Sequence, residues 1–104
     1  SQNDIINFAF DADTAKFWVG INGTWLHSGD PAAGSNEVAS TTSAGFFTPC
    51  LEHAGVTYTI ESNFGSAPYS ISSGNADANG YGNFEYAVPS GFYAWCTKNI
   101  AQYG

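Results

Sequence analysis

Between residues 5 and 26, large apolar side chains alternate with small or polar ones, and this period of two constrains the fold more than any other feature. Such a period is typical of a β-strand whose two faces differ. A first run places Ile6, Phe8 and Phe10 on one face, and a second run follows between residues 16 and 21. Asn22-Gly23 is the strongest short turn signal, because both residues tolerate positive φ. The pattern predicts that the two runs form an antiparallel hairpin around a turn at residues 11–14, and that the chain turns back again at Asn22-Gly23 through residues 24–26.

Alternation returns in later segments, which predict further short strands. These segments are 46–51, 56–60, 69–71, 84–88 and 92–97. In the second of them Val56, Tyr58 and Ile60 share one face, which we expect to point to the core. Two segments rich in Gly, Ser, Asn and Asp, 28–45 and 72–83, are typical of loops. Short strands separated by such turns predict an antiparallel β-sandwich, with residues 1–104 as a single domain.

Charge and the length of the apolar runs argue against two classes of partner. Only 11% of the residues are charged, and nine carboxylates against two lysines give a net charge of −7. Proteins that bind nucleic acid neutralise its phosphates with Lys and Arg, so nucleic acid is an unsuitable partner. No apolar run approaches the roughly 20 residues that a membrane-spanning helix needs. We therefore expect no nucleic-acid binding and no membrane insertion.

Several motifs occur in the same order as in one known family. Residues 8–25 follow the pattern aliphatic-A-x-D-x-D and then W-x-G-x-N-G-x-W. Asp30-Pro31-Ala32, Asn63-Phe64-Gly65 and the segments 75–86 and 89–99 come next. Together they resemble SPRY (B30.2-like) domains, in the form found in structural proteins of bacteriophages and marine viruses. The resemblance lies in the C-terminal portion of that domain, so we expect a truncated version of it.

The resemblance implies an antiparallel β-sandwich of the concanavalin-like, jelly-roll kind, located on a virion or outside the cell. It also implies that the domain binds a protein or a surface glycan through its loops, without catalysis and without a cofactor. The alternative is a purely structural part of the virion, which covers a neighbouring subunit and has no separate ligand.

The loops expected to recognise a ligand are 22–45 and 72–83. The residues that we expect to contact it are Trp25, Asp30, Asn79, Tyr81 and Tyr103. Trp18 and Trp95 fall inside predicted strands instead, where a tryptophan more often packs against its neighbours.

The sequence shows no pattern of catalytic residues. His27 and His53 lie in or beside loops, without a hydrolase, metalloprotease or nucleotide-binding motif around them. A glycosidase needs two carboxylates about 5 to 10 Å apart across a cleft. Glu52, Glu61 and Glu85 instead alternate outward from apolar strand faces, which places them on the solvated side of a sheet. We therefore expect no catalytic residue and no enzymatic activity.

Asp11 and Asp13 form a D-x-D pair, whose oxygens are of the type that calcium prefers. The later Gly and Glu of an EF-hand loop are missing, however, and a hairpin turn uses Asp for its own hydrogen bonds. Calcium at Asp11 and Asp13 is therefore the weaker of two interpretations.

The two cysteines, Cys50 and Cys96, are too far apart in sequence for a C-x-x-C motif. Cys96 shares the alternation of Phe92 and Ala94, and Cys50 shares that of Phe46. If these faces point inward from opposite sheets, the two sulfurs are within reach of a disulfide. A buried pair of free thiols is the alternative, and the sequence does not decide between them.

The strand predicted at residues 5–10 lacks the Lys, Pro or bulge that commonly protects a strand edge. The earlier strands of the SPRY domain, with which it would pair, are absent from the sequence. We therefore expect this edge to pair with a second copy of the chain, in a homo-oligomer. The alternative is a compact monomer in which residues 5–10 lie in the middle of a sheet.

Overall fold

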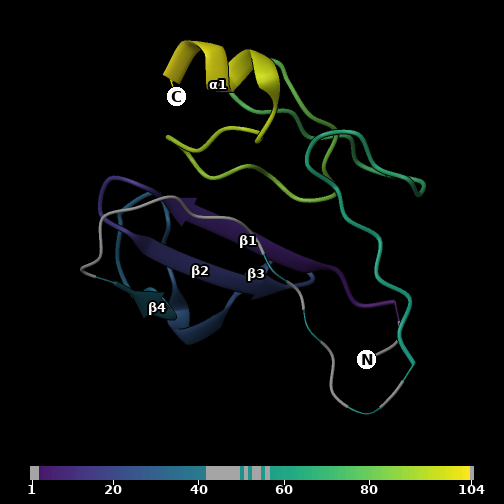
Figure 1. The fold of residues 1–104 in the computed structure, drawn as a ribbon, viewed down its shortest axis with the longest axis horizontal. Helices are drawn as coiled ribbons and strands as arrows, with labels where there is room; N and C mark the ends of the chain where they lie inside the picture. The colour runs from purple at the N-terminus through teal and green to yellow at the C-terminus, as the bar shows by residue number, and fades with distance from the viewer. Residues whose placement is uncertain (1–2, 42–49, 51, 53–54, 56, 104) are drawn as a thin grey trace.

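The computed structural model describes residues 3–41, 50, 52, 55 and 57–103. Figure 1 shows strands in the N-terminal part of the chain and a helix at its C-terminal end. The elements are β1 (Ile6–Asp11), β2 (Lys16–Ile21), β3 (Thr24–Trp25), the 3-10 helix η1 (Leu26–Ser28), β4 (Ala39–Ser40) and α1 (Thr97–Tyr103). Regular structure in the described residues is mostly antiparallel strand in one open sheet, with little helix. The chain is therefore a small β-rich fold.

β2 is the central strand of this sheet. β1 pairs with one of its edges along its whole length, while β3 and β4 share the other edge. All three pairings are antiparallel. At the turn after β2, Asn22 and Gly23 have φ angles of 51° and 83°, which is the conformation that favours Asn-Gly. The predicted hairpin and its Asn-Gly turn are thus confirmed.

The core lies against the sheet face that holds the smaller side chains of β1. Ala9 and Trp18 are opposite each other in the register and are 6% and 1% exposed. The indole Nε1 of Trp18 donates to the carbonyl oxygen of Ser35 at 2.8 Å, so its one polar atom is paired. The large side chains Ile6 and Phe8 are on the opposite face and are 46% and 52% exposed. The predicted packing role of Trp18 is confirmed.

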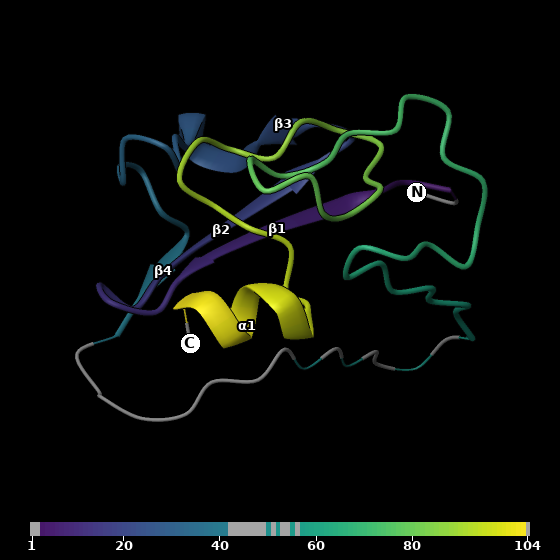
Figure 2. The same cartoon turned by 90° about the horizontal axis from the view of Figure 1, so that it is seen from above.

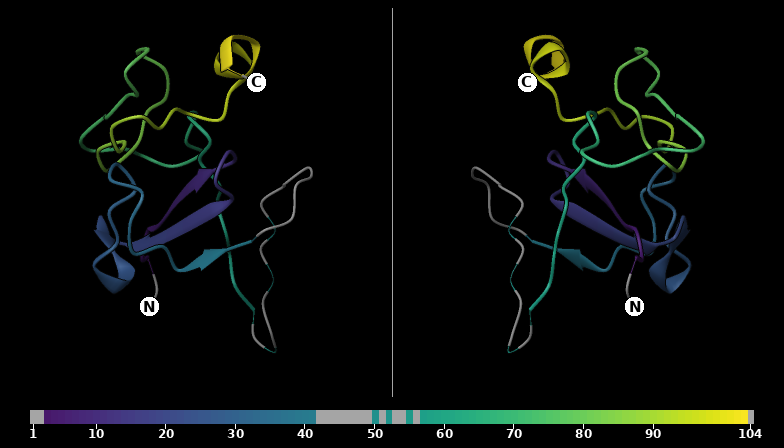
Figure 3. Two further views of the ribbon diagram at one scale, coloured as in Figure 1. Left: turned by 90° about the vertical axis from the view of Figure 1, so that its left-hand side faces the viewer. Right: turned by 90° about the vertical axis from the view of Figure 1, so that its right-hand side faces the viewer.

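Residues 62–103 form a second layer over the buried face of the sheet, as Figure 3 shows. In Figure 2 the segment that leads into α1 crosses above β1 and β2. The Phe92 ring meets the Trp18 ring edge-on, with centroids 5.9 Å apart, and Ala94 is 4% exposed. A Cβ on Gly23 would lie 2.6 Å from the ring of Tyr86, so that glycine allows the layers to approach closely.

The later strands predicted from alternation do not form in the described residues. Segments 57–60, 69–71, 84–88 and 92–96 contain no strand, and those predictions are wrong. Most of the strand predicted at 46–51 lies outside the described residues.

Near residues 75 and 84–85, hydrogen bonds from side chains take the place of the backbone hydrogen bonds of a sheet. Asn75 and Phe84 form one isolated backbone bridge, and the side-chain amide of Asn75 then donates to the carbonyl oxygens of Phe84 and Glu85. Asn and Ser side chains compete with backbone pairing in this way. Tyr58 and Ile60 are 60% and 52% exposed, so their predicted orientation toward the core is also wrong. Val56 lies outside the described residues.

α1 begins at Thr97, where the sequence predicts the end of a strand. The N–H of Ile100 donates to the carbonyl oxygen of Cys96 at 2.9 Å, and Asn99, which is 4% exposed, fixes the helix to the interior. In the described part of the chain, no helix has the length and apolar character needed to cross a membrane.

Neither interpretation of the cysteines holds. Cys50 and Cys96 are both free, and Cys50 is exposed while Cys96 is half-buried. The disulfide prediction needed Cys96 in a strand that faces an opposite sheet. Residues 92–96 form no strand, and the chain enters α1 directly after Cys96. The disulfide and the buried thiol pair are therefore both wrong.

We expect the substitution Trp18→Phe to lower the free energy of unfolding by about 2 to 3 kcal/mol. It removes part of a fully buried ring and one of the two donors to the Ser35 carbonyl oxygen, which keeps only its bond from the Asp30 N–H. Urea unfolding followed by circular dichroism measures the change. The matched control is Trp95→Phe, because Trp95 is 50% exposed, and it should cost less than about 0.5 kcal/mol. Equal losses in the two variants would contradict the placement of Trp18.

Candidate functional site

A buried carboxylate organises the C-terminal layer. Asp77 is 6% exposed, and each of its oxygens accepts two hydrogen bonds. Oδ1 accepts from the N–H groups of Asn79 and Tyr81, both at 2.9 Å. Oδ2 accepts from the N–H of Ala94 at 2.8 Å and from the side-chain amide of Asn99 at 2.7 Å. Four donors therefore surround a single charge and compensate for its burial.

The local sequence after Asp77 explains how the loop reaches this conformation. The N–H of Gly80 donates to the Asp77 carbonyl oxygen, and the Asp77 N–H donates to the Tyr81 carbonyl oxygen, both at 2.9 Å. Gly80 has a φ of 80°, which glycine adopts without a steric cost. An Asp that caps its own turn in this manner is a recurring turn motif. Residues 77–81 are therefore held as a closed turn.

Asn99 joins this turn to α1. Its Oδ1 accepts from Asn79 Nδ2 at 2.9 Å, and its Nδ2 also donates to the Ala94 carbonyl oxygen at 2.8 Å. Asn79 Nδ2 lies 3.3 Å from the Tyr103 hydroxyl. The Tyr103 ring stacks on that of Tyr93, with centroids 4.5 Å apart. The helix and the turn are therefore one connected unit.

Hydrogen bonds in this layer shift the pKa of three side chains, Asp77, Glu85 and Tyr93. Burial alone would raise the pKa of Asp77, but its four donors outweigh that effect and hold the pKa below its ordinary value of 3.8. The Ser72 hydroxyl and N–H, which both donate to Glu85, lower the pKa of that carboxyl. Hydrogen bonding with Tyr103 raises the pKa of Tyr93.

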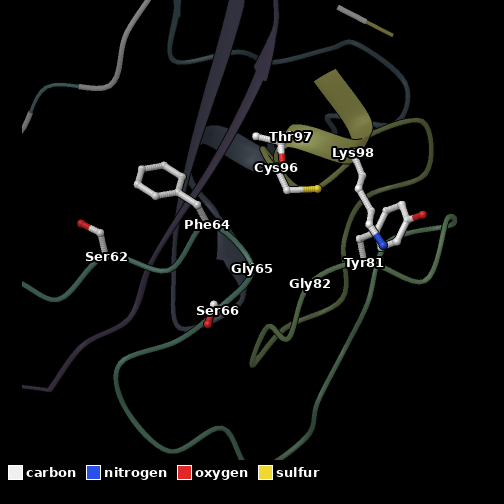
Figure 4. A pocket seen from close by; sticks show the side chains of 9 residues that line it. All are labelled: Ser62, Phe64, Gly65, Ser66, Tyr81, Gly82, Cys96, Thr97 and Lys98. Carbon is white, nitrogen blue, oxygen red and sulfur yellow. The ribbon is translucent and has the colours of Figure 1, made fainter. Parts of the chain in front are cut away.

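A shallow pocket opens beside this unit (Figure 4). Its volume is about 470 Å³, within the usual range for small-ligand sites. The residues that line it are Ser62, Phe64, Gly65, Ser66, Tyr81, Gly82, Cys96, Thr97 and Lys98. Figure 4 shows Phe64 on one side of the pocket and Tyr81 with Lys98 on the other.

Aromatic rings and one cation dominate the pocket. The ammonium of Lys98 lies 5.1 Å from the centroid of the Tyr81 ring, a cation–π distance. Phe64 meets Trp95 edge-on at 5.8 Å, and these two rings are 49% and 50% exposed. Trp95 lies in no strand and half of it is exposed, so its predicted packing inside a strand is wrong.

The structure brings together three of the five predicted ligand residues. Asn79, Tyr81 and Tyr103 belong to the unit of turn and helix, and Tyr81 lines the pocket. Trp25 lies elsewhere, half-buried with its ring 3.1 Å from where a Cβ on Gly20 would be.

Asp30 also lies apart from the pocket. Its Oδ1 accepts from the N–H of Ala33 at 3.0 Å, and its backbone pairs with Ser35. Both contacts shape the loop after η1.

Sequence reasoning missed Asp77, Phe64, Lys98 and Asn99. The Asp-Ala-Asn-Gly sequence at residues 77–80 is the one local signal that would have pointed to Asp77, since an Asp two residues before Asn-Gly is suited to cap a turn. Phe64, Lys98 and Asn99 lie outside residues 77–81, and no local pattern in the sequence links them to that turn.

The Asp11 carboxylate makes hydrogen bonds within its own hairpin turn, which was the alternative to calcium binding. Its Oδ1 accepts from the N–H groups of Asp13 and Thr14, and its Oδ2 accepts from the Thr14 hydroxyl at 2.6 Å. These bonds, that of the Thr14 hydroxyl first, lower the pKa of Asp11. Among the described residues, no three His, Cys, Asp or Glu side chains are grouped in a way that could hold a metal ion. His27 is exposed at η1, and His53 lies outside the described residues.

Comparisons of the chain with protein-family models, with curated proteins and with solved structures found no match. The fold and the site define a small β-rich protein with a shallow pocket of aromatic rings and hydroxyls beside a buried carboxylate.

We expect Asp77→Asn to lower the free energy of unfolding at neutral pH by about 2 to 4 kcal/mol, because an amide nitrogen would face N–H donors. The folded pKa of Asp77 is depressed, so its contribution is present above pH 3.8 and is lost as the pH falls through the folded pKa. The variant should therefore lose less stability than the wild type on acidification. Urea unfolding across this pH range measures both effects.

The matched control is Asp13→Asn, which makes the same charge change at an exposed position. It should leave stability at neutral pH nearly unchanged. An Asp77→Asn variant as stable as this control would contradict the role of the buried carboxylate.

Proposed function

We propose that the chain is a non-catalytic binding or assembly module of a viral structural protein, of the kind found in phages. It recognises a protein or a surface glycan at the pocket between residues 62–66, Tyr81 and the start of α1. In this proposal the domain is a SPRY-like β-sandwich, in which residues 8–25 supply the family's hairpin. The motif resemblance and the antiparallel sheet support that assignment.

The main support is a set of partly exposed aromatic rings that are held in place around a shallow pocket. Aromatic side chains give large contact areas and lose little conformational entropy on binding. Tyr81 is fixed through its backbone by Asp77, and Phe64 is held against Trp95. A site that is already ordered avoids part of the entropic cost of association.

The chemistry of the lining supports binding rather than hydrolysis. The described residues that line the pocket include the hydroxyls of Ser62, Ser66 and Thr97 and the phenol of Tyr81, and no carboxylate or histidine. Glycoside hydrolysis needs a pair of carboxylates at the scissile bond. Hydroxyls and aromatic rings instead match the alternating O–H groups and C–H faces of a sugar.

We expect the chain to bind a defined set of glycans on an array, and Tyr81→Ala to weaken that binding at least about tenfold. Trp25→Phe should bind like the wild type, because Trp25 packs against Gly20 and lies apart from the pocket. Loss of binding in Trp25→Phe with retention in Tyr81→Ala would move the site to loop 22–45 and contradict this location. A folded chain that binds neither glycans nor a protein would favour the purely structural role.

We also propose that β1 pairs with β1 of a second copy. Its outer edge has no strand partner among the described residues, and unprotected edges are templates for pairing. If two β1 strands pair antiparallel with Phe8 opposite Phe8, Ile6 faces Phe10, so apolar side chains meet on one face.

Light scattering over a dilution series should therefore show masses above the 11.0 kDa of one chain. Phe8→Glu should shift the mass to that of a single chain, because it places like charges opposite each other. Thr24→Glu, at an exposed position on β3, is the control and should still associate. A wild type of 11.0 kDa at every concentration would refute the oligomer.

A further inference from the structure

The two lysines of the chain have different surroundings. Lys16 donates to the Gly34 carbonyl oxygen at 2.8 Å and forms an ion pair with Glu37 at 3.5 Å. Lys98 contacts the Tyr81 ring, and no carboxylate of the described residues pairs with it. The positive charge of Lys98 is therefore available to a ligand, whereas that of Lys16 is already compensated.

The pocket also differs from the rest of the surface in charge. The chain has nine carboxylates and no Arg, yet Lys98 is the one charged side chain among the described residues that line the pocket. An anion at most other places on this protein would meet net negative charge. At the pocket it would meet an ammonium over an aromatic ring, with the hydroxyls of Ser66 and Thr97 in the same lining.

The number of cations limits the charge of the ligand. One Lys is a point charge that suits one carboxylate, whereas phosphate and sulfate groups are most often bound by several donors or by the paired donors of Arg. A net charge of −7 opposes a polyanion further. The aromatic rings of Phe64 and Tyr81 require in addition an apolar face on the ligand.

We propose that this pocket binds a sugar that bears a carboxylate, such as a uronic acid residue of a surface polysaccharide. The carboxylate pairs with Lys98, the C–H face of the sugar ring packs on Tyr81 or Phe64, and the sugar hydroxyls bond to the serine and threonine hydroxyls. This inference rests on the proposed binding function and adds the ligand class.

Titration of the isotope-labelled full chain, followed by NMR, compares glucuronate with glucose. We expect glucuronate to bind about three- to fivefold more tightly, the amount that one exposed ion pair supplies. Shifts should centre on Tyr81, Thr97 and Lys98. Raising the salt concentration should weaken glucuronate binding and leave glucose binding unchanged.

Variants assign the preference to one side chain. Lys98→Gln should bind the two sugars equally, and Lys98→Arg should keep the preference for glucuronate. Lys16→Gln is the matched control, with the same loss of charge outside the pocket, and it should behave like the wild type. Tyr81→Ala should weaken both sugars, because it removes the ring on which they pack.

Three results would overturn the inference. If glucose binds as tightly as glucuronate and Tyr81→Ala abolishes both, the carboxylate proposal fails while the binding function stands. If neither sugar shifts a pocket residue, the glycan-binding form of the proposed function fails as well. If a short acidic peptide binds at Lys98 more tightly than glucuronate does, the ligand belongs to another class.

Discussion

The burial of one carboxylate determines the structure of the half of the molecule that lacks a sheet. Asp77 accepts bonds from its own turn, from Ala94 and from α1, so three segments share a single charge. A buried charge is tolerated only when donors surround it. The loss of one donor would therefore weaken the others, and the turn, the segment before α1 and the helix are expected to keep or lose their order together.

The sheet supplies the rigid base for this unit. Trp18 is the connection, because its ring meets Phe92 in the upper layer and its Nε1 is bonded to the loop after η1. Two small residues leave room for that ring: Ala9 lies opposite Trp18, and a Cβ on Gly29 would lie 3.0 Å from the Trp18 ring. The large apolar side chains of β1 lie on the other face of the sheet, where Phe8 stacks on Phe17 of β2 with ring centroids 5.6 Å apart.

Alternation predicted the hairpin well because turn chemistry and register agree over residues 6–25. It failed at residues 57–60 and 84–96 because a period of two specifies two faces but does not specify a partner strand. There, Asn75 and Glu85 supply side-chain bonds to the backbone instead. Asn79 and Tyr103, two of the residues predicted to contact a ligand, lie within hydrogen-bond distance of each other. Lys98 gave no sequence signal, since a single charge is usually solvated, and the signal for Asp77 was limited to the turn sequence at residues 77–80.

An acidic protein can present a site for an anion only if its own charges near that site are neutralised. Tyr81 belongs to the same turn as Asp77, so the Asp77 charge is close along the chain to the pocket. Four N–H donors point at that charge, and their positive ends reduce its field outside the turn. The donors that lower the pKa of Asp77 thus also shield an incoming carboxylate from it. The interaction that orders the turn therefore leaves Lys98 as the dominant charge that a ligand in the pocket would encounter.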